Sequence, residues 1–166
     1  IALKALNLIG RWLPDAVFDS QNVNARGAMQ VASCMAGVAF LKGLGLVHSI
    51  SHAIGAQYGT HHGLTNAITL PAVMRFNATS IRDKCPEISQ ALNLEVRDFD
   101  AIYNWICRLL DHLEIPKSLA EIGVETSKVS SLAKRAFSDT ATGTNPRKPK
   151  LEELEMVLRE AITKGR

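Results

Sequence analysis

Apolar side chains recur with a period of about 3.6 residues along almost the whole chain, and no stretch alternates convincingly with period two. This spacing gathers apolar side chains on one face of a helix, whereas strands need alternation. The clearest stripe follows Asp98, a good N-cap residue, and ends before Pro116; it consists of Phe99, Ile102, Ile106, Leu109 and Leu113. Another follows Pro149 and consists of Leu151, Leu154, Leu158 and Ile162. The pattern predicts an all-α fold.

Proline and small residues set the expected limits of the first two helices. Pro14 disfavours helical geometry in the residue before it, so a first helix should end there, and Asp19 or Ser20 would cap the next. The second helix carries many small residues, which let a neighbouring helix approach closely, so we expect it in the core. These residues are Gly27, Ala28, Ala32, Ala36, Gly37 and Ala39.

Glycines separate the following helices. Gly43 to Gly45 interrupt the helical pattern, which resumes at Leu46 and ends at Gly59. The run from Leu64 to Asn77 is apolar enough for a buried helix, with Pro71 inside it as a kink or a break.

Size and composition exclude several classes of protein. The chain has 166 residues, of which 46% are hydrophobic, which suits one globular domain. A formal net charge of +3 is too small to indicate nucleic-acid binding. The chain contains no run of eighteen apolar residues and no signal peptide, which argues for a soluble, cytoplasmic protein without a membrane span. Cys34, Cys85 and Cys107 include no Cys-x-x-Cys pair, so we expect buried thiols.

The start of the sequence suggests a piece of a longer protein. The chain begins at Ile1 without an initiator methionine and with apolar spacing already under way, so we expect a fragment of a two-domain chain. An apolar face should then be exposed where the absent part would pack. Such a face would drive self-association, so a homo-oligomer stays open.

Four of the five histidines lie within fifteen residues of one another, from His48 to His62. His48 and His52 are four residues apart and share a face of a helix, while a glycine lets the chain turn so that His62 approaches them. A single histidine on a helix is more often a core or surface residue than a ligand. Three of them among small residues instead indicate a site for zinc, iron, copper or nickel.

Other polar residues have a structural and a functional interpretation. His61 either faces solvent beside the site or is a substitute ligand, and the first is favoured because adjacent loop positions point apart. His112 lies beside Asp111 in an amphipathic helix, so we expect it at the surface. The segment Asn145-Pro146-Arg147 is either a structural loop or a site where the arginine binds phosphate or carboxylate.

The segment from Gly45 to Asn77 resembles the second signature of the iron-containing (group III) alcohol dehydrogenases. The matching residues are Gly45, His48, His52, Gly55, Ala56, His62, Gly63, Asn66, Ala67, Leu70, Pro71, Val73 and Asn77. Similar correspondence covers Arg26 to Phe40, Ala136, Asp139 and Asn145-Pro146-Arg147, and hence nearly the whole chain. His61 departs from the signature, which usually has proline there.

This resemblance implies a fold and a metal site. Residues 1–166 would be the multi-helix, metal-binding catalytic C-terminal domain of the dehydroquinate synthase-like fold. His48 and His62 would be two of four metal ligands. His52 would lie beside the metal near the nicotinamide, as a catalytic and cofactor-binding residue. The ion would be Fe(II), although Zn(II) is also compatible with such ligands.

The resemblance also implies an activity for the intact protein. It would interconvert a primary alcohol and an aldehyde with NAD or NADP, with the divalent ion as Lewis acid. In the family, an aspartate and a histidine on the helix before residue 1 complete the metal site. The nucleotide-binding N-terminal domain is also absent, because no strand leads into a glycine-rich turn that would hold a pyrophosphate. We therefore expect this chain alone to be inactive.

Two other interpretations remain open. The chain would be a stand-alone helical module that binds metal or a protein partner if no nucleotide-binding domain precedes it. Alternatively, the chain would have the same fold but catalyse a different reaction, as in glycerol dehydrogenase or dehydroquinate synthase, which are more distantly similar. The match from Gly45 to Thr65 disfavours this interpretation.

Overall fold

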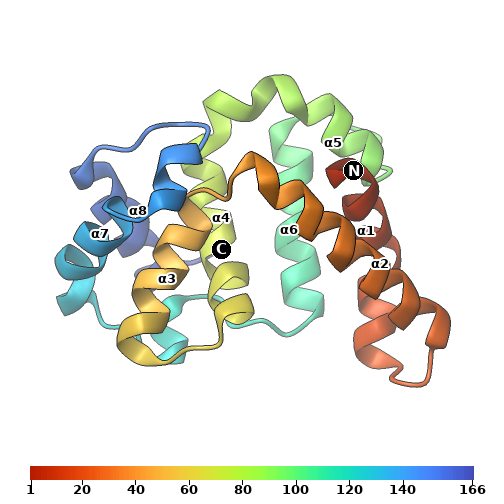
Figure 1. The fold of residues 1–166 in the computed structure, drawn as a ribbon, viewed down its shortest axis with the longest axis horizontal. Coiled ribbons are helices and arrows are strands. Elements are labelled where there is room, and N and C mark those ends of the chain that lie inside the picture. Colours follow the sequence, from red (N-terminus) through yellow and green to blue (C-terminus); the bar gives the residue numbers. More distant parts are fainter. The chain divides into compact units, whose positions relative to one another are not determined.

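The computed structural model describes residues 1–166, which form eight α-helices and five short 3-10 helices without a β-strand (Figure 1). The predicted all-α class is confirmed. The chain divides into two compact units: unit 1 is Ile1–Lys42 with Ile81–Leu113, and unit 2 is Gly43–Ser80 with Glu114–Arg166. That residues 1–166 make up one domain stays a prediction. No single helix is both long and apolar enough to cross a membrane.

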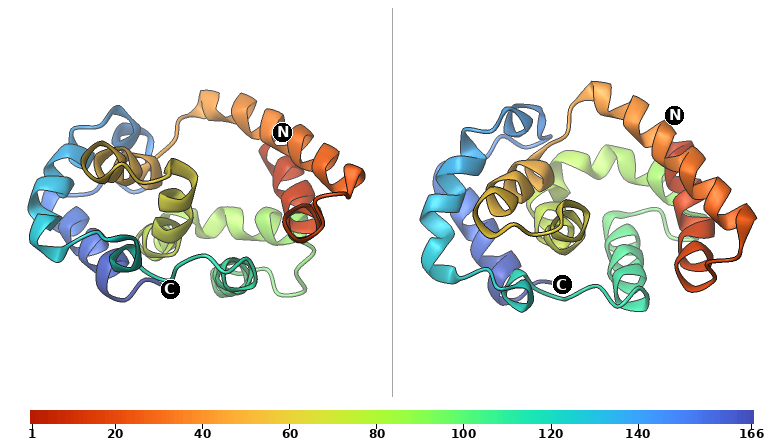
Figure 2. Two further views of the ribbon diagram at one scale, coloured as in Figure 1. Left: turned by 90° about the horizontal axis from the view of Figure 1, so that it is seen from below. Right: turned by 60° about the horizontal axis from the view of Figure 1, so that its bottom comes forward.

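Unit 1 is built around two long helices that lie side by side (Figures 1 and 2). Its elements are α1 (Ala2–Phe18), α2 (Val23–Ala39), η1 (Phe40–Lys42), η2 (Arg82–Lys84), α5 (Cys85–Ala91) and α6 (Phe99–His112). The side chain of Asn7 joins α1 to α5, because its Nδ2 donates a hydrogen bond to the Ala91 carbonyl at 2.8 Å. Asp98 caps α6 as expected, since its side chain accepts a hydrogen bond from Ala101 N at 2.8 Å.

Several predicted helix limits in unit 1 are wrong. α1 does not end before Pro14 but continues to Phe18, because packing against α2 outweighs the one backbone hydrogen bond that proline removes. The cap of α2 is Asn22, whose Oδ1 accepts a hydrogen bond from Ala25 N at 3.0 Å, whereas Asp19 belongs to the preceding turn. The short helix α5 was not expected. Its seven residues are too few to show a period in sequence.

The prediction that α2 lies in the core is also wrong. α2 buries only Ala25 and Ala32, while Val31 and Val38 are 54% and 48% exposed. Cys34 is exposed on the same helix, so the expectation of buried thiols fails there, although Cys85 is buried. Unit 1 has an exposed apolar face around a pocket of about 880 Å³, but that an absent part of the protein packs there stays a prediction. The large apolar residues that line this pocket are Ile1, Leu3, Leu6, Val38, Leu41 and Ile88.

Unit 2 contains the main hydrophobic core. Its elements are α3 (Leu46–Tyr58), α4 (His62–Ile81), η3 (Leu119–Ile122), η4 (Thr126–Lys128), α7 (Val129–Phe137), η5 (Thr140–Thr144) and α8 (Leu151–Thr163). α7 packs against both α3 and α8 (Figure 2). The largest fully buried side chains include Leu46, Ile50, Ile54, Ile68, Leu119, Leu132, Leu154, Leu158 and Ile162. Burial of each such side chain contributes roughly 1.5–3 kcal/mol, so this core holds α3 and α4 rigidly.

Most predicted limits in unit 2 are confirmed. Helix α3 begins after Gly45 and ends at Gly59, whose left-handed conformation closes its last turn. Helix α4 begins at His62, two residues earlier than expected, and runs through the buried Pro71 without a break. The core contacts of α4 therefore outweigh the hydrogen bond lost at the proline.

Candidate metal centre

The first turn of α3 is fixed by two buried asparagines, Asn77 and Asn145, which we call the asparagine clamp. Asn145 Oδ1 accepts a hydrogen bond from Leu46 N at 3.1 Å. The two asparagine side chains exchange hydrogen bonds of 2.7 and 3.1 Å. Gly45 enters the helix with φ +118°, and a Cβ there would lie 3.1 Å from Asn145 Oδ1. Only glycine fits this turn well, and the clamp thereby sets the position of His48, two residues after Leu46.

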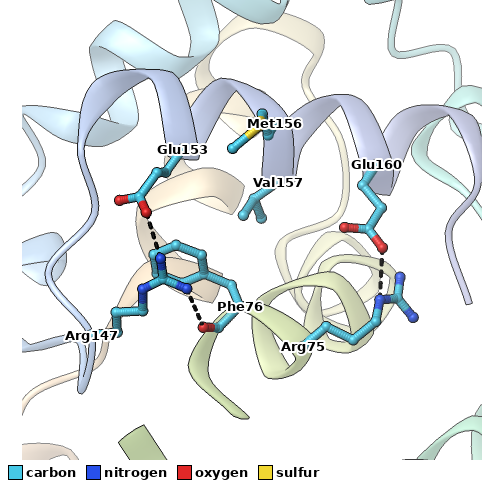
Figure 3. A pocket seen from close by; sticks show the side chains of 7 residues that line it. All are labelled: Arg75, Phe76, Arg147, Glu153, Met156, Val157 and Glu160. Carbon is cyan, nitrogen blue, oxygen red and sulfur yellow. Dashed lines mark hydrogen bonds and ion pairs between the residues drawn. The ribbon is translucent and has the colours of Figure 1, made fainter. Parts of the chain in front are cut away.

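The loop that carries Asn145 is held by an arginine. The Arg147 guanidinium lies 4.1 Å from the centroid of the Phe76 ring, donates to the Phe76 carbonyl at 3.1 Å and pairs with Glu153. Arg147 lines a surface pocket of about 340 Å³ together with a second pair, Arg75 and Glu160 (Figure 3). Both guanidinium groups in the pocket are thus paired with carboxylates. The structure therefore supports a structural role for the loop and offers no free guanidinium for an anion.

The structure brings the three histidines of the predicted site together. His48 and His52 lie one turn apart on α3, and His62 is the first residue of α4. The ring centroids are 5.3 Å apart for His48 and His62, 5.4 Å for His52 and His62, and 6.0 Å for His48 and His52. The turn after Gly59 therefore returns the chain to the face of α3 that carries the histidines.

His48 and His62 present the same ring nitrogen to one amide. Asn66 Nδ2 lies 3.1 Å from His62 Nε2 and 3.5 Å from His48 Nε2. Ser51 Oγ donates to the His48 carbonyl at 3.1 Å and lies 3.2 Å from His62 Nδ1. Since the Ser51 proton is already engaged, His62 Nδ1 donates to Ser51 Oγ, and its Nε2 keeps a lone pair. The Nε2 lone pair is what imidazole offers to a metal ion.

Burial favours the neutral form of His48. Partial burial and the nearby His62 and His52 lower the pKa of His48, and Asp139 opposes them only weakly. A neutral imidazole is the form that binds metal, so the environment of His48 suits a ligand. The buried Asn66 Oδ1 has no hydrogen-bond partner, although the Nδ2 of the same amide reaches both histidines. His48 and His62 thus offer two converging nitrogen donors that fit a metal ion.

His52 differs from its two neighbours, because its Nδ1 faces a carboxylate. His52 Nδ1 lies 2.9 Å from Asp139 Oδ2, and the His52 side chain is 43% exposed. Partial burial by itself raises the pKa of Asp139. This effect is outweighed by the hydrogen bonds from Ala141 N and His52 and by the charges of His52 and His48, so the pKa of Asp139 lies below its ordinary range. No three His, Cys, Asp or Glu side chains in the 166 residues are arranged to hold a metal by themselves.

The other two histidines make different contacts. His61 is exposed, and its Nδ1 accepts a hydrogen bond from Leu64 N at 3.3 Å, which supports the first turn of α4. His112 is exposed, as expected, and its ring contacts Phe18 with centroids 5.0 Å apart. The solvent-facing interpretation of His61 therefore fits the structure better than that of a substitute ligand.

Sequence reasoning missed the polar partners of the histidines. Asn66 is four residues after His62 and shares its face of α4, which was a usable signal. Ser51 is three residues after His48 and shares its face of α3, so it also gave a local signal. Asp139 lies 87 residues from His52, so only the folded chain brings them together.

Comparisons with known proteins place the chain in a family. The sequence model for the C-terminal part of the Fe-containing alcohol dehydrogenase family matches residues 1–162. The chain belongs to the iron-containing alcohol dehydrogenase family. It is 35% identical to the NAD-dependent methanol dehydrogenase of Bacillus methanolicus over 97% of its length. Its structure resembles those of a 1,3-propanediol oxidoreductase (TM-score 0.93, 32% identity) and an iron-containing alcohol dehydrogenase from Thermococcus thioreducens (TM-score 0.87, 34% identity), each over 96% of the chain.

The chain spans less than half the length of these relatives. It covers 44% of the methanol dehydrogenase, 44% of the 1,3-propanediol oxidoreductase and 42% of the Thermococcus protein. It corresponds to the C-terminal, all-helical part of the family fold.

Proposed function

We propose that this chain provides His48 and His62 as metal ligands, and His52 as a proton-transfer group, to an NAD(P)-dependent alcohol dehydrogenase. The observation that carries the proposal is the convergence of His48 Nε2 and His62 Nε2 on the single amide nitrogen of Asn66. Two lone pairs aimed at one point are the starting requirement of a metal site.

Each of the two ligands is oriented through its surroundings. Ser51 holds His62 through Nδ1, so that ring presents Nε2. The asparagine clamp holds the turn of α3 that carries His48. Fixed rings lose little entropy on binding and therefore hold an ion in a defined place. Nitrogen ligands without sulfur suit Fe(II), in line with the iron of the family's name, and also Zn(II).

When bound there, the divalent ion would supply Lewis-acid polarisation of the substrate oxygen. His52 stands beside the two ligands, with centroids 5.4 and 6.0 Å from theirs, and its side chain is partly exposed. It can therefore take the alcohol proton and release it to solvent. The nicotinamide, when bound, would supply the hydride acceptor.

The activity belongs to the intact protein. Because the chain spans less than half of its relatives and offers two ligands, we assign the remaining ligands and the nucleotide site to an upstream domain. The substrates would be a primary alcohol and its aldehyde, in line with the methanol dehydrogenase and 1,3-propanediol oxidoreductase that it resembles. The chain by itself would bind metal weakly and show no activity.

Metal analysis of the intact protein tests these roles. His48→Ala and His62→Ala should both lose the metal and the activity, whereas His52→Ala should keep the metal and turn over more slowly. His112→Ala is the matched control, because His112 is exposed and remote in sequence from the site, and it should behave like the wild type.

A His52→Ala protein without metal would contradict the division of roles. Calorimetry on the 166-residue chain gives an independent test: sub-nanomolar binding of Zn(II) or Fe(II) would contradict the shared site and favour a stand-alone metal-binding module.

A further inference from the structure

The carboxylate of Asp139 is held from two sides. Asp139 precedes η5 as its N-cap, and its Oδ1 accepts a hydrogen bond from Ala141 N at 2.8 Å. Its Oδ2 lies 2.9 Å from His52 Nδ1. An ionised carboxylate only accepts hydrogen bonds, so His52 Nδ1 must carry the proton of this pair. In a neutral His52 ring, Nε2 then keeps the lone pair.

The position of Asp139 does not depend on its bond to His52. Thr142, on η5, has its Oγ1 2.8 Å from Ser49 Oγ and 2.6 Å from the Ala136 carbonyl. Ser49 is fully buried and Thr142 nearly so. Ser49 precedes His52 by three residues and shares its face of α3. This buried contact ties η5 to α3 and brings the carboxylate to the imidazole.

We propose that Asp139 is a positioning residue for His52, which fixes the ring in the Nδ1–H tautomer and so presents the Nε2 lone pair to the reacting alcohol. The proposal rests on the proposed function of His52. In the step concerned, the O–H bond of the alcohol breaks, its proton bonds to His52 Nε2, and the O–H electron pair becomes the second bond of the aldehyde C=O as the C–H bond gives up its hydride, which a bound nicotinamide would accept. A ring in the other tautomer carries a proton on Nε2 and cannot accept this one.

The isosteric change Asp139→Asn should reverse the tautomer. Ala141 N is a donor and requires an oxygen opposite it, so the amide of the variant must place its NH₂ toward His52. His52 Nδ1 then becomes an acceptor, and the proton moves to Nε2. Asp139→Ser is a second variant, because serine still caps η5 but is too short to hold the ring, and it should give a mixture of tautomers.

Nitrogen NMR of the histidine rings reads the tautomer directly in the metal-free chain, under conditions where the ring is neutral. We expect Nδ1–H for His52 in the wild type and Nε2–H in Asp139→Asn. Asp98→Asn is the matched control, since Asp98 is also an N-cap with a 2.8 Å bond to a backbone N–H but has no histidine beside it. It should leave His52 unchanged. A wild-type ring protonated on Nε2, or an unchanged ring in Asp139→Asn, would overturn the positioning role.

Kinetics of the intact protein give the second readout. Asp139→Asn should lower kcat by about 10²-fold or more, the usual contribution of a positioned base, with little change in KM and with full metal content. A normal kcat together with a reversed tautomer would overturn the proposal. Absence of dehydrogenase activity in the intact wild type would overturn the proposed function. The tautomer measurement does not require activity, so it tests the role of Asp139 independently.

Discussion

Replacement of Asn145 by alanine should destabilise the chain more than any other single loss of a polar side chain discussed above. Asn145 is 5% exposed and makes four hydrogen bonds, two as acceptor and two as donor. Its partners include Leu46 N and both the oxygen and the nitrogen of the Asn77 side-chain amide, and Leu46 and Asn77 are also buried. Removal of Asn145 therefore leaves several buried polar groups without partners.

The magnitude follows from these contacts. A hydrogen bond contributes about 1 kcal/mol net to stability, so the loss of four should cost about 4 kcal/mol. This is a large part of the 5–15 kcal/mol that usually separates a folded domain from its unfolded chain. Because the clamp fixes the turn before His48, the variant should also bind metal more weakly when expressed in the intact protein.

Urea denaturation of the metal-free chain measures the effect. Asn22→Ala is the matched control, because Asn22 accepts one part-buried cap hydrogen bond from Ala25 N, and its loss should cost about 1 kcal/mol. A cycle with Asn77→Ala isolates the two hydrogen bonds between the asparagines and should show a coupling of about 2 kcal/mol. If Asn145→Ala costs no more than Asn22→Ala, the clamp does not hold α3 as described.

Two further predictions concern the same helices. Gly45→Ala should destabilise the chain in urea, because φ at Gly45 is +118° and Asn145 Oδ1 would lie 3.1 Å from the new Cβ. Gly27→Ala in the open part of α2 should instead stabilise the chain by roughly 0.5–1 kcal/mol. Equal effects of the two changes would be inconsistent with the strained turn at Gly45. Since burial, His62 and His52 lower the pKa of His48, an NMR titration of the metal-free chain should place its midpoint below 6.5 and move it upward in His62→Ala. As the pH falls, His48 becomes protonated in the unfolded chain before it does so in the folded chain, so its contribution to stability is lost as the pH falls below 6.5. A titration midpoint that does not move in His62→Ala would argue against the proximity of the two rings.

Local signals in the sequence were sufficient for the helix class and for the grouping of histidines. The 3.6-residue stripes gave α6 and α8, and Gly45 and Gly59 marked the two ends of α3. The spacing of His48 and His52, followed by a glycine turn, was enough to expect convergence with His62, which the ring distances show. These features depend on residues close together in the chain.

Features that depend on tertiary packing were not accessible in the same way. Pro14 was expected to end a helix and Pro71 to kink or break one, but contacts with α2 carry α1 past Pro14, and contacts in the core carry α4 past Pro71. The alanines of α2 suggested a core helix, yet small side chains are equally compatible with an open face, which is what unit 1 has. The pairing of His52 with Asp139 spans 87 residues and had no local signal.

The most direct test of the central claim is anomalous diffraction from crystals of the intact protein loaded with Fe(II) or Zn(II). We expect one metal peak at about 2.0–2.1 Å from the Nε2 atoms of both His48 and His62, with His52 outside bonding distance. A peak bonded to only one of these two histidines, or one held by His61, would contradict it.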